Sequence, residues 1–197
     1  MPHHIPKLVV LDRDGVINLD SDYFVKSPDE WIPIPGSLEA IAMLNHAGYR
    51  VVVASNQSGI GRGLFEMSAL NAMHQKMHKA LLALGGRVDA VFFCPHTAAE
   101  NCGCRKPKAG MLHQIAERFD VDLRGVPVVG DSLRDLQAGV EVGCAPHLVK
   151  TGKGLRTLEK GGLPPDTRVH DDLHAFVETF LAERAAVTPP STPDGRS

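Results

Sequence analysis

The chain has 197 residues, of which 43% are apolar and 22% are charged, and its formal net charge is -2. This length supports one hydrophobic core, and the near-neutral charge excludes the basic field that attracts nucleic acid or an anionic membrane surface. No apolar run approaches the roughly 18 residues that a membrane span requires. We therefore expect a cytoplasmic, monomeric protein whose partner is a small molecule.

Short apolar runs alternate with amphipathic segments along the chain. The apolar runs predict buried strands at 8–11, 50–54, 88–93 and 126–129, with the end of a fifth at 147–149. Helical spacing of leucine, methionine and alanine predicts helices at 36–46, 67–84, 109–119, 133–142 and 173–184. This order favours an α/β fold with a doubly wound, mainly parallel sheet and helices on both faces. We expect one domain over 1–186 and a disordered tail over 187–197.

Two aspartates follow the first predicted strand, in VVLDRDGVIN. In open α/β sheets ligands bind at the carboxyl ends of the strands, and period-two alternation would send Asp12 and Asp14 to the same side. Gly15 then lets the chain turn away. Carboxylates this close repel one another unless a cation such as Mg²⁺ lies between them or one carries a proton, and both solutions suit phosphate chemistry. Taken alone, such a pair is more often a solvated turn or helix cap.

The ends of two other predicted strands carry polar motifs. In SNQSGIGRG, Asn56 and exposed backbone N–H groups could cradle phosphate oxygens, and Arg62 adds a cation; the alternative is an ordinary strand-to-helix turn. In GDSLRD, Asp131 could be a further metal ligand. Asp135 begins a helix, where it is either a favourable first-turn acid or metal support.

The segment CRKPKAGML places two cations just before a predicted helix. Lys106 could hold a phosphate and a nucleophilic carboxylate together, and Arg105 could contact the more distant part of a substrate. If Lys106 stood alone, a solvated loop lysine would be the preferred interpretation.

Three cysteines and one histidine crowd into CPHTAAENCGC, at Cys94, His96, Cys102 and Cys104. Three thiolates and an imidazole match tetrahedral Zn²⁺ with no vacant position, which is typical of a structural site. The ion would stabilise a loop with too little apolar content to fold alone. Free buried thiols are the alternative.

The remaining cysteine and histidines show no such clustering. We expect Cys144 to be a small buried apolar residue. We expect most of the other histidines to lie on the surface or on helix faces: His3, His4, His46, His74, His78, His113, His147, His170 and His174.

Over about residues 7–150 the chain resembles the haloacid dehalogenase (HAD) superfamily of aspartate-dependent phosphatases. Four motifs occur in the order found in that family: DRDGV, a strand ending in Ser55, Lys106 before a helix, and GDSLRD. The resemblance implies that Asp12 is the nucleophile and that Asp14 acts first as acid and then as base. It also implies Mg²⁺ held by Asp12, the backbone carbonyl of Asp14, and Asp131. Val16 stands where threonine is common. We expect phosphate and substrate to be bound by Ser55, Asn56, Gln57, Arg62, Arg105 and Lys106.

Within the superfamily, the chain resembles two groups of compact, zinc-bearing phosphatases. One group acts on heptose bisphosphate and the other on histidinol phosphate. SNQSGIGRG, CRKPKAGML and VKTGKG resemble the heptose group, whereas the five-residue gap between His96 and Cys102 resembles the other. The resemblance implies hydrolysis of the C7 phosphate of D-glycero-D-manno-heptose 1,7-bisphosphate in bacterial envelope synthesis, with histidinol phosphate as the alternative. A third hypothesis is a zinc-stabilised module that binds phosphorylated ligands without turnover. The Asp12 and Asp14 pair argues against it, because additional negative charge does not help a protein that only binds phosphate.

The spacing of the motifs leaves no room for a separate cap domain. About forty residues separate the first two motifs, and scaffold helices and strands already fill this interval. Substrate selection must then fall to loops, and we expect the loop 18–31, the turn 59–63 and the zinc loop to carry it.

Overall fold

The computed structural model describes residues 5–187 and contains a six-stranded parallel sheet. The strands are β1 (Leu8–Leu11), β2 (Arg50–Asn56), β3 (Ala90–Cys94), β4 (Pro127–Gly130), β5 (Ala145–Val149) and β6 (Arg168–His170). Their order in the sheet is β3-β2-β1-β4-β5-β6. The winding therefore reverses between β1 and β4, which is the point where such sheets bind ligands.

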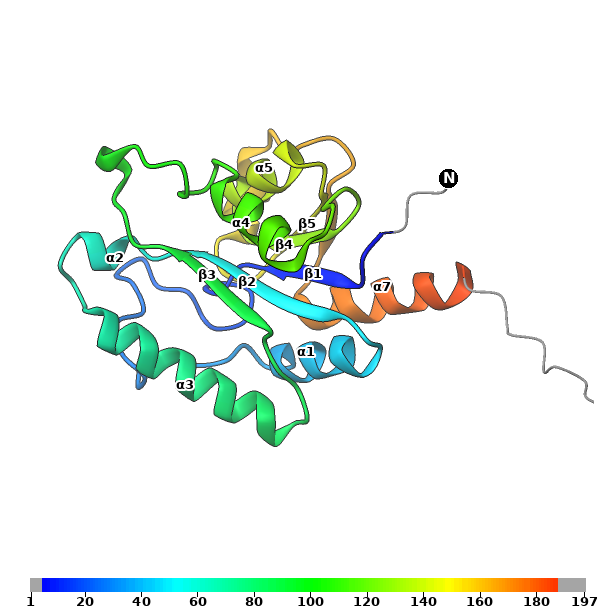
Figure 1. The fold of residues 1–197 in the computed structure, drawn as a ribbon, viewed down its shortest axis with the longest axis horizontal. Coiled ribbons are helices and arrows are strands. Elements are labelled where there is room, and N and C mark those ends of the chain that lie inside the picture. Colours follow the sequence, from blue (N-terminus) through cyan, green and yellow to red (C-terminus); the bar gives the residue numbers. More distant parts are fainter. Residues whose placement is uncertain (1–4, 188–197) are drawn as a thin grey trace, which may run out of the picture.

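Helices cover both faces of the sheet, as predicted (Figure 1). On one face lie α1 (Ser37–His46), α3 (Met67–Ala83) and α7 (Leu173–Val187). On the other lie α4 (Gly110–Phe119) and α5 (Leu133–Glu141). The shorter elements are α2 (Ser58–Gly61), the 3-10 helix η1 (Ala98–Glu100) and α6 (Gly154–Lys160).

The central strand β1 is buried on both sides, which explains its unbroken apolar sequence. Val9 and Leu11 belong to the core beneath α1, α3 and α7, whereas Leu8 and Val10 belong to the core beneath α4. All four side chains are at most 1% exposed. Alternate burial on the two faces fixes the register of the strand, and so it fixes where its carboxyl end opens to solvent.

Several boundaries differ from those predicted. β2 extends through Asn56 and β3 spans Ala90–Cys94, whereas β5 ends at Val149, as predicted. Neither α6 nor β6 was predicted from the sequence. β6 has only three residues and pairs with β5 alone at the edge of the sheet, so it lacks the apolar run of a central strand.

Two histidines are exceptions to the surface position expected for most of them. His147 on β5 and His170 on β6 are buried, with 3.0 Å between His147 Nδ1 and His170 Nε2, and both rings contact Phe176 of α7. Cys144 is buried, as predicted. His3, His4 and the tail after Val187 lie outside the described residues, and Val187 itself ends α7 rather than beginning a tail.

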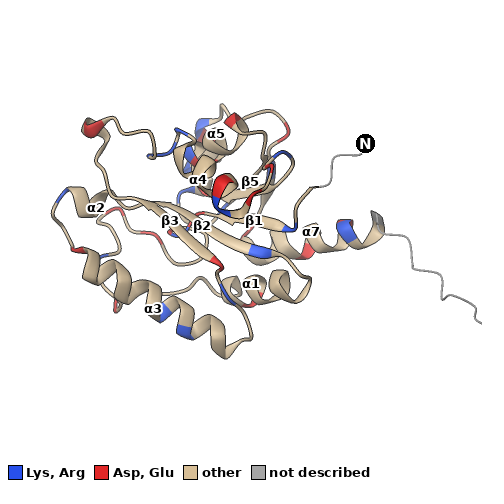
Figure 2. Ribbon diagram, viewed as in Figure 1, with Lys and Arg blue, Asp and Glu red and all other residues tan. Residues whose placement is uncertain are grey.

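Acidic and basic residues are interspersed along the ribbon, in agreement with the small net charge (Figure 2). Within residues 5–187, no helix has the length and apolarity needed to cross a membrane.

The buried histidine pair predicts a loss of stability in mild acid. Burial, with repulsion from His170 and Arg168, lowers the pKa of His147 from 6.5 to about 3. Because the pKa is lower in the folded state, the unfolded chain takes up the proton first, and stability is lost as the pH falls below about 6.5. Between pH 7 and pH 5 this residue alone should reduce the free energy of unfolding by about 2 kcal/mol.

Urea unfolding measured across this pH range tests the prediction. His147→Leu should lose most of this pH dependence, whereas the exposed His46→Leu should keep it. Equal slopes in the two variants would contradict the assignment.

Candidate active site

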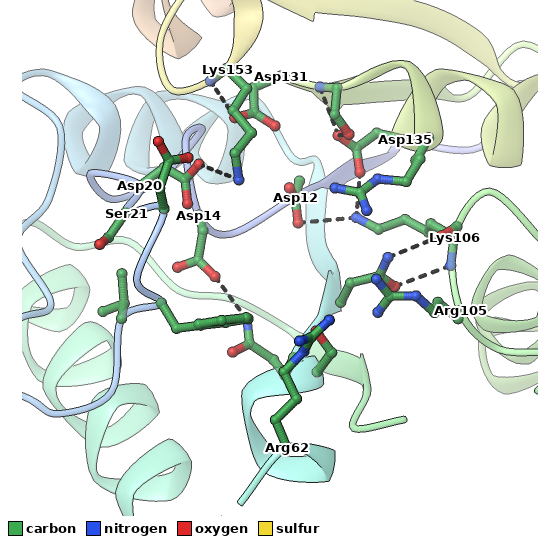
Figure 3. Close-up of a pocket in the computed structure, with 18 residues that line it drawn as sticks. Asp12, Asp14, Asp20, Ser21, Arg62, Arg105, Lys106, Asp131, Asp135 and Lys153 are labelled. Atoms are coloured by element: carbon green, nitrogen blue, oxygen red, sulfur yellow. Dashed lines mark hydrogen bonds and ion pairs between the residues drawn. The ribbon is translucent and has the colours of Figure 1, made fainter. Parts of the chain in front are cut away.

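A cavity of about 250 Å³ opens at the carboxyl ends of the strands. Eight of the residues predicted for catalysis, substrate binding or Mg²⁺ line it: Asp12, Asp14, Asn56, Gln57, Arg62, Arg105, Lys106 and Asp131. Figure 3 shows Asp12, Lys106 and Asp131 reaching the same space from separate segments of the chain. The parallel sheet therefore brings together segments far apart in sequence.

Lys106 lines the cavity between the buried carboxylate of Asp135 and the partly buried carboxylate of Asp12. Its Nζ is 3.0 Å from Asp12 Oδ1 and 2.6 Å from Asp135 Oδ1, and it donates to the carbonyl of Ala54 at 2.6 Å. Burial alone would lower the pKa of Lys106, but Asp12 and Asp135 outweigh it and raise this pKa. Lys106 is thus a fixed, permanently charged ammonium group, not a solvated loop lysine.

The carboxylates outnumber the single lysine. Burial, reinforced by Asp135, raises the pKa of Asp12 to about 7, and burial with repulsion from Asp135 and Asp12 raises the pKa of Asp131 to about 8. Burial acts in the same direction on Asp135, but Lys106 overcomes it and lowers that pKa. Oxygens of Asp12, Asp131 and Asp135 lie within 4.8 Å of one another. Such an oxygen set with excess negative charge fits a hard divalent cation.

Two glycines allow these acids to approach the backbone. Gly15 has a φ of 83°, and a Cβ there would collide with Asp131. A Cβ on Gly130 would collide with Asp135, which also accepts hydrogen bonds from the backbone and hydroxyl of Ser132 in a capping box. Asp135 therefore both begins α5 and contacts Lys106, so the two roles that the sequence left open coexist.

Asp14 stands apart from the acid cluster. Its carboxylate accepts hydrogen bonds from Arg13 Nη2 at 2.9 Å, Asn18 Nδ2 at 2.8 Å and Gln57 Nε2 at 2.9 Å. β1 ends at Leu11, so the backbone is not the extended strand from which a shared side was predicted. Asp12 and Asp14 nevertheless line the same cavity, because the fully buried Arg13 donates hydrogen bonds to the Asp14 carboxylate and fixes its position.

At the end of β2, the amide side chains of Asn56 and Gln57 line the cavity, whereas the hydroxyl of Ser55 does not. Ser55 is 1% exposed and does not line the cavity; its Oγ accepts a hydrogen bond from Gln57 Nε2 at 2.7 Å. Asn56 bonds both the backbone N–H and the carbonyl of Lys106 at 3.1 Å. These bonds join the loop that carries Lys106 to the end of β2.

Two arginines form a basic side of the cavity. Arg105 donates to the carbonyl of His96 at 3.3 Å, and the Arg62 guanidinium lies 5.8 Å from the centre of the Phe24 ring. In Figure 3, Arg105 lies across the cavity from Asp20.

Sequence reasoning named the loop 18–31 but missed individual residues that line the cavity: Asp20, Ser21, Asp22, Phe24, Val25, Ser58, Ser132, Arg134 and Lys153. Lys153 pairs with Asp20 at 2.9 Å, and its backbone N–H donates to Asp131 at 2.8 Å. The VKTGKG motif was the available signal for Lys153.

The predicted zinc ligands gather at the end of β3. The sulfur atoms of Cys94, Cys102 and Cys104 lie 3.3 to 3.5 Å apart, and His96 Nδ1 lies 3.3 Å from Cys104 Sγ. Ligands at about 2.3 Å from a tetrahedral zinc lie about 3.8 Å apart, so this set would need to open only slightly to hold Zn²⁺. Cys104 directly precedes Arg105 and Lys106, which ties the zinc loop to the cavity.

The comparisons with known proteins agree with this geometry. Residues 7–134 match the polynucleotide kinase 3 phosphatase family model, and residues 103–176 match the HAD-hydrolase-like model. A D-glycero-beta-D-manno-heptose-1,7-bisphosphate 7-phosphatase of Bordetella bronchiseptica is 62% identical over 90% of this chain and 99% of its own length. Its counterpart in Pseudomonas aeruginosa is 54% identical over 88% of this chain and 97% of its own length.

A solved structure is also similar. The crystal structure of D,D-heptose 1,7-bisphosphate phosphatase from B. bronchiseptica, complexed with magnesium and phosphate, has a TM-score of 0.89 and 62% identity. The alignment covers 90% of this chain and 99% of that one.

Proposed function

This chain belongs to the D-glycero-beta-D-manno-heptose-1,7-bisphosphate 7-phosphatase family of the HAD superfamily, and on that premise we propose that it hydrolyses the C7 phosphate of this sugar. The observation that carries the proposal is the buried cluster in which Lys106 lies 3.0 Å from Asp12. A mere phosphate-binding module gains nothing from additional carboxylates, so this cluster favours turnover. Both relatives are named for the β anomer, which favours that anomer as the substrate here.

In the first half of the reaction an oxygen of Asp12 attacks phosphorus, the bond from phosphorus to the C7 oxygen breaks, and Asp14 gives that oxygen its proton. In the second half Asp14 takes a proton from water, whose oxygen attacks the aspartyl phosphate. Inorganic phosphate leaves and the Asp12 carboxylate is restored. The three side chains that donate hydrogen bonds to Asp14 fix its carboxylate outside the cluster of Asp12, Asp131 and Asp135, which is consistent with a separate role for it.

We assign Mg²⁺ to Asp12, Asp131 and the backbone carbonyl of Asp14, and the magnesium in the similar crystal structure supports this assignment. When bound, the ion shields the phosphate from repulsion by the attacking carboxylate. Asp135 holds Lys106, whose ammonium group stays beside Asp12 and the transferring phosphoryl group. Gln57, Asn56 and Ser55 order the end of β2 around them.

Substrate selection is assigned to the loops, with Arg62, Arg105 and the loop 18–31 facing the sugar. We also propose that the chain acts as a cytoplasmic monomer with one domain over 1–186, in the synthesis of envelope heptose. Its small net charge supports a small-molecule partner. Sedimentation of the full chain tests the oligomeric state.

Steady-state kinetics test the proposed function. The value of kcat/KM for D-glycero-β-D-manno-heptose 1,7-bisphosphate should exceed that for histidinol phosphate by about 100-fold or more. Histidinol phosphate is the alternative that the short gap between His96 and Cys102 favours, and a preference for it would overturn the assignment. Binding of either compound without release of phosphate would instead support the non-catalytic module.

We propose that Zn²⁺ on Cys94, His96, Cys102 and Cys104 is structural. Its support is the closed set of four ligand atoms within 4.8 Å of one another, which leaves no vacant position for a substrate. The ion orders the loop immediately before Lys106. We therefore expect that replacing one of its ligands lowers zinc content, stability and turnover together.

Cys104→Ser tests this role. Zinc content should fall from about one ion per chain to nearly none, and Tm should fall by about 10 °C or more, because metal binding contributes directly to folding. Turnover should fall as well, since the Lys106 segment loosens. Metal analysis and thermal unfolding provide the measurements. Ala99→Ser, an exposed change in the same loop, should leave all three properties intact; a Cys104→Ser protein with normal zinc would contradict the ligand set.

A further inference from the structure

A fully buried arginine forms an ion pair with Asp14. The Arg13 side chain is 0% exposed and does not line the cavity of the active site, whereas the Asp14 side chain is 19% exposed and does line it. A buried guanidinium is stable only when a counter-charge and hydrogen bonds compensate it. Asp14 supplies both, so the charge of Arg13 is directed at the carboxylate to which the proposed function assigns the proton transfers.

The hydrogen bonds among these side chains form a closed network. Arg13 Nε donates to Asp14 Oδ1 at 3.0 Å and Arg13 Nη2 donates to Asp14 Oδ2 at 3.0 Å, a two-pronged geometry that fixes both the position and the plane of a carboxylate. Arg13 Nη2 also donates to Gln57 Oε1 at 3.2 Å, and Gln57 Nε2 donates to Asp14 Oδ2 at 2.9 Å. The Asp14 carboxylate therefore cannot rotate without breaking several hydrogen bonds.

The other end of the guanidinium meets a histidine of α3. Arg13 Nη1 lies 3.5 Å from Nε2 of the half-buried His74. Burial, with repulsion from Arg13, lowers the pKa of His74 to about 4, so the ring is neutral near pH 7. When the proton of the neutral ring is on Nδ1, Nε2 is an acceptor for Nη1. His74 does not line the cavity either, and it joins α3 to the network around Asp14.

We propose that Arg13 is a positioning residue for the proton that Asp14 gives to the leaving oxygen, and that His74 acts through Arg13. The inference rests on the proposed function, in which the bond from phosphorus to the C7 oxygen breaks as that oxygen takes the proton. A sugar alkoxide is a poor leaving group, so its departure depends on the orientation of the acid. A purely structural role of Arg13 and His74 would instead affect the hydrolysis of every substrate equally.

Two substrates with different leaving groups test the proposal. 4-Nitrophenyl phosphate releases a stabilised phenolate that needs no proton, whereas the heptose bisphosphate releases an alkoxide that does. We define the leaving-group ratio as kcat/KM for the bisphosphate divided by kcat/KM for 4-nitrophenyl phosphate. This ratio should fall about 100-fold in Arg13→Met and about fivefold in His74→Leu, because a misplaced acid slows only the step that needs its proton. KM for the bisphosphate should stay near that of the parent, since sugar binding is not altered.

Two further variants complete the test. His78→Leu removes an exposed histidine one turn further along α3 and should leave the leaving-group ratio unchanged. Asp14→Asn removes the acid itself and should lower the ratio at least as far as Arg13→Met does. If Arg13→Met does not fold, His74→Leu decides the outcome.

The proposal is overturned if the variants of Arg13 and His74 lower kcat/KM for both substrates equally, or change neither value. An unchanged ratio in Asp14→Asn would overturn it together with the acid role that the proposed function gives to Asp14. Hydrolysis of the bisphosphate by the parent reports the proposed function independently, so the two failures are distinguishable.

Discussion

Asp12→Asn is expected to reduce kcat by about four orders of magnitude or more while the protein stays folded. The amide has no anionic oxygen to attack phosphorus, so no aspartyl phosphate forms. Folding should persist because the change relieves a carboxylate whose ionised form is already unfavourable: desolvation and Asp135 raise the pKa of Asp12 to about 7. Lys106 keeps Asp135 and the carbonyl of Ala54 as partners.

The decisive measurement is the mass of the acid-quenched protein during turnover. The parent should gain one phosphoryl group and Asp12→Asn should gain none, with unchanged circular dichroism and zinc content. Asp29→Asn makes the same chemical change at an exposed position of the loop 18–31, and it should retain near-parent turnover. Phosphorylation of the Asp12→Asn protein would assign the nucleophile to another residue.

The sequence alone was sufficient to predict five of the six strands of the sheet and the gathering of the motifs. Val51, Val52 and Val53 of β2 are fully buried, and such unbroken apolar runs mark strands covered on both faces. Because parallel strands end at one edge, Asp12 and Asp131 were expected to meet there. Val16, which stands where threonine is common, is fully buried in the core, so its side chain is separate from the chemistry.

Other features depended on contacts that no local pattern contains. α6 is short and polar, and it is fixed by the Thr157 bond to Asp131 rather than by an amphipathic pattern. The direction of Asp14 depends on Arg13, whose burial follows from the loop after β1 and not from strand alternation. Likewise, no spacing rule brings Asp135 onto Lys106, because their ion pair depends on how α5 packs beside the loop before α4.

Lys106→Met is expected to lower both stability and turnover, because it removes the ammonium group that pairs with both Asp12 and Asp135. Methionine has a similar length, so the main change is the loss of charge. Removing one partner of a buried ion pair typically costs about 3–5 kcal/mol of unfolding free energy, because the remaining charges are left uncompensated. We expect kcat to fall by about a thousandfold or more, since the phosphoryl group loses the same cation.

The pH dependence of this loss separates charge from packing. Lys106 lowers the pKa of Asp135, so their pairing contributes stability above the ordinary aspartate pKa of 3.8, and the contribution is lost as the pH falls through the lower folded value. Urea unfolding of the metal-free proteins should therefore show the full difference between parent and Lys106→Met at pH 7 and a smaller one near pH 3. Lys108→Met removes an exposed lysine two residues away and should cost less than about 1 kcal/mol. A pH-independent difference for Lys106→Met would mean that the lysine acts by filling space, in which case its ammonium group is not what holds the two aspartates together.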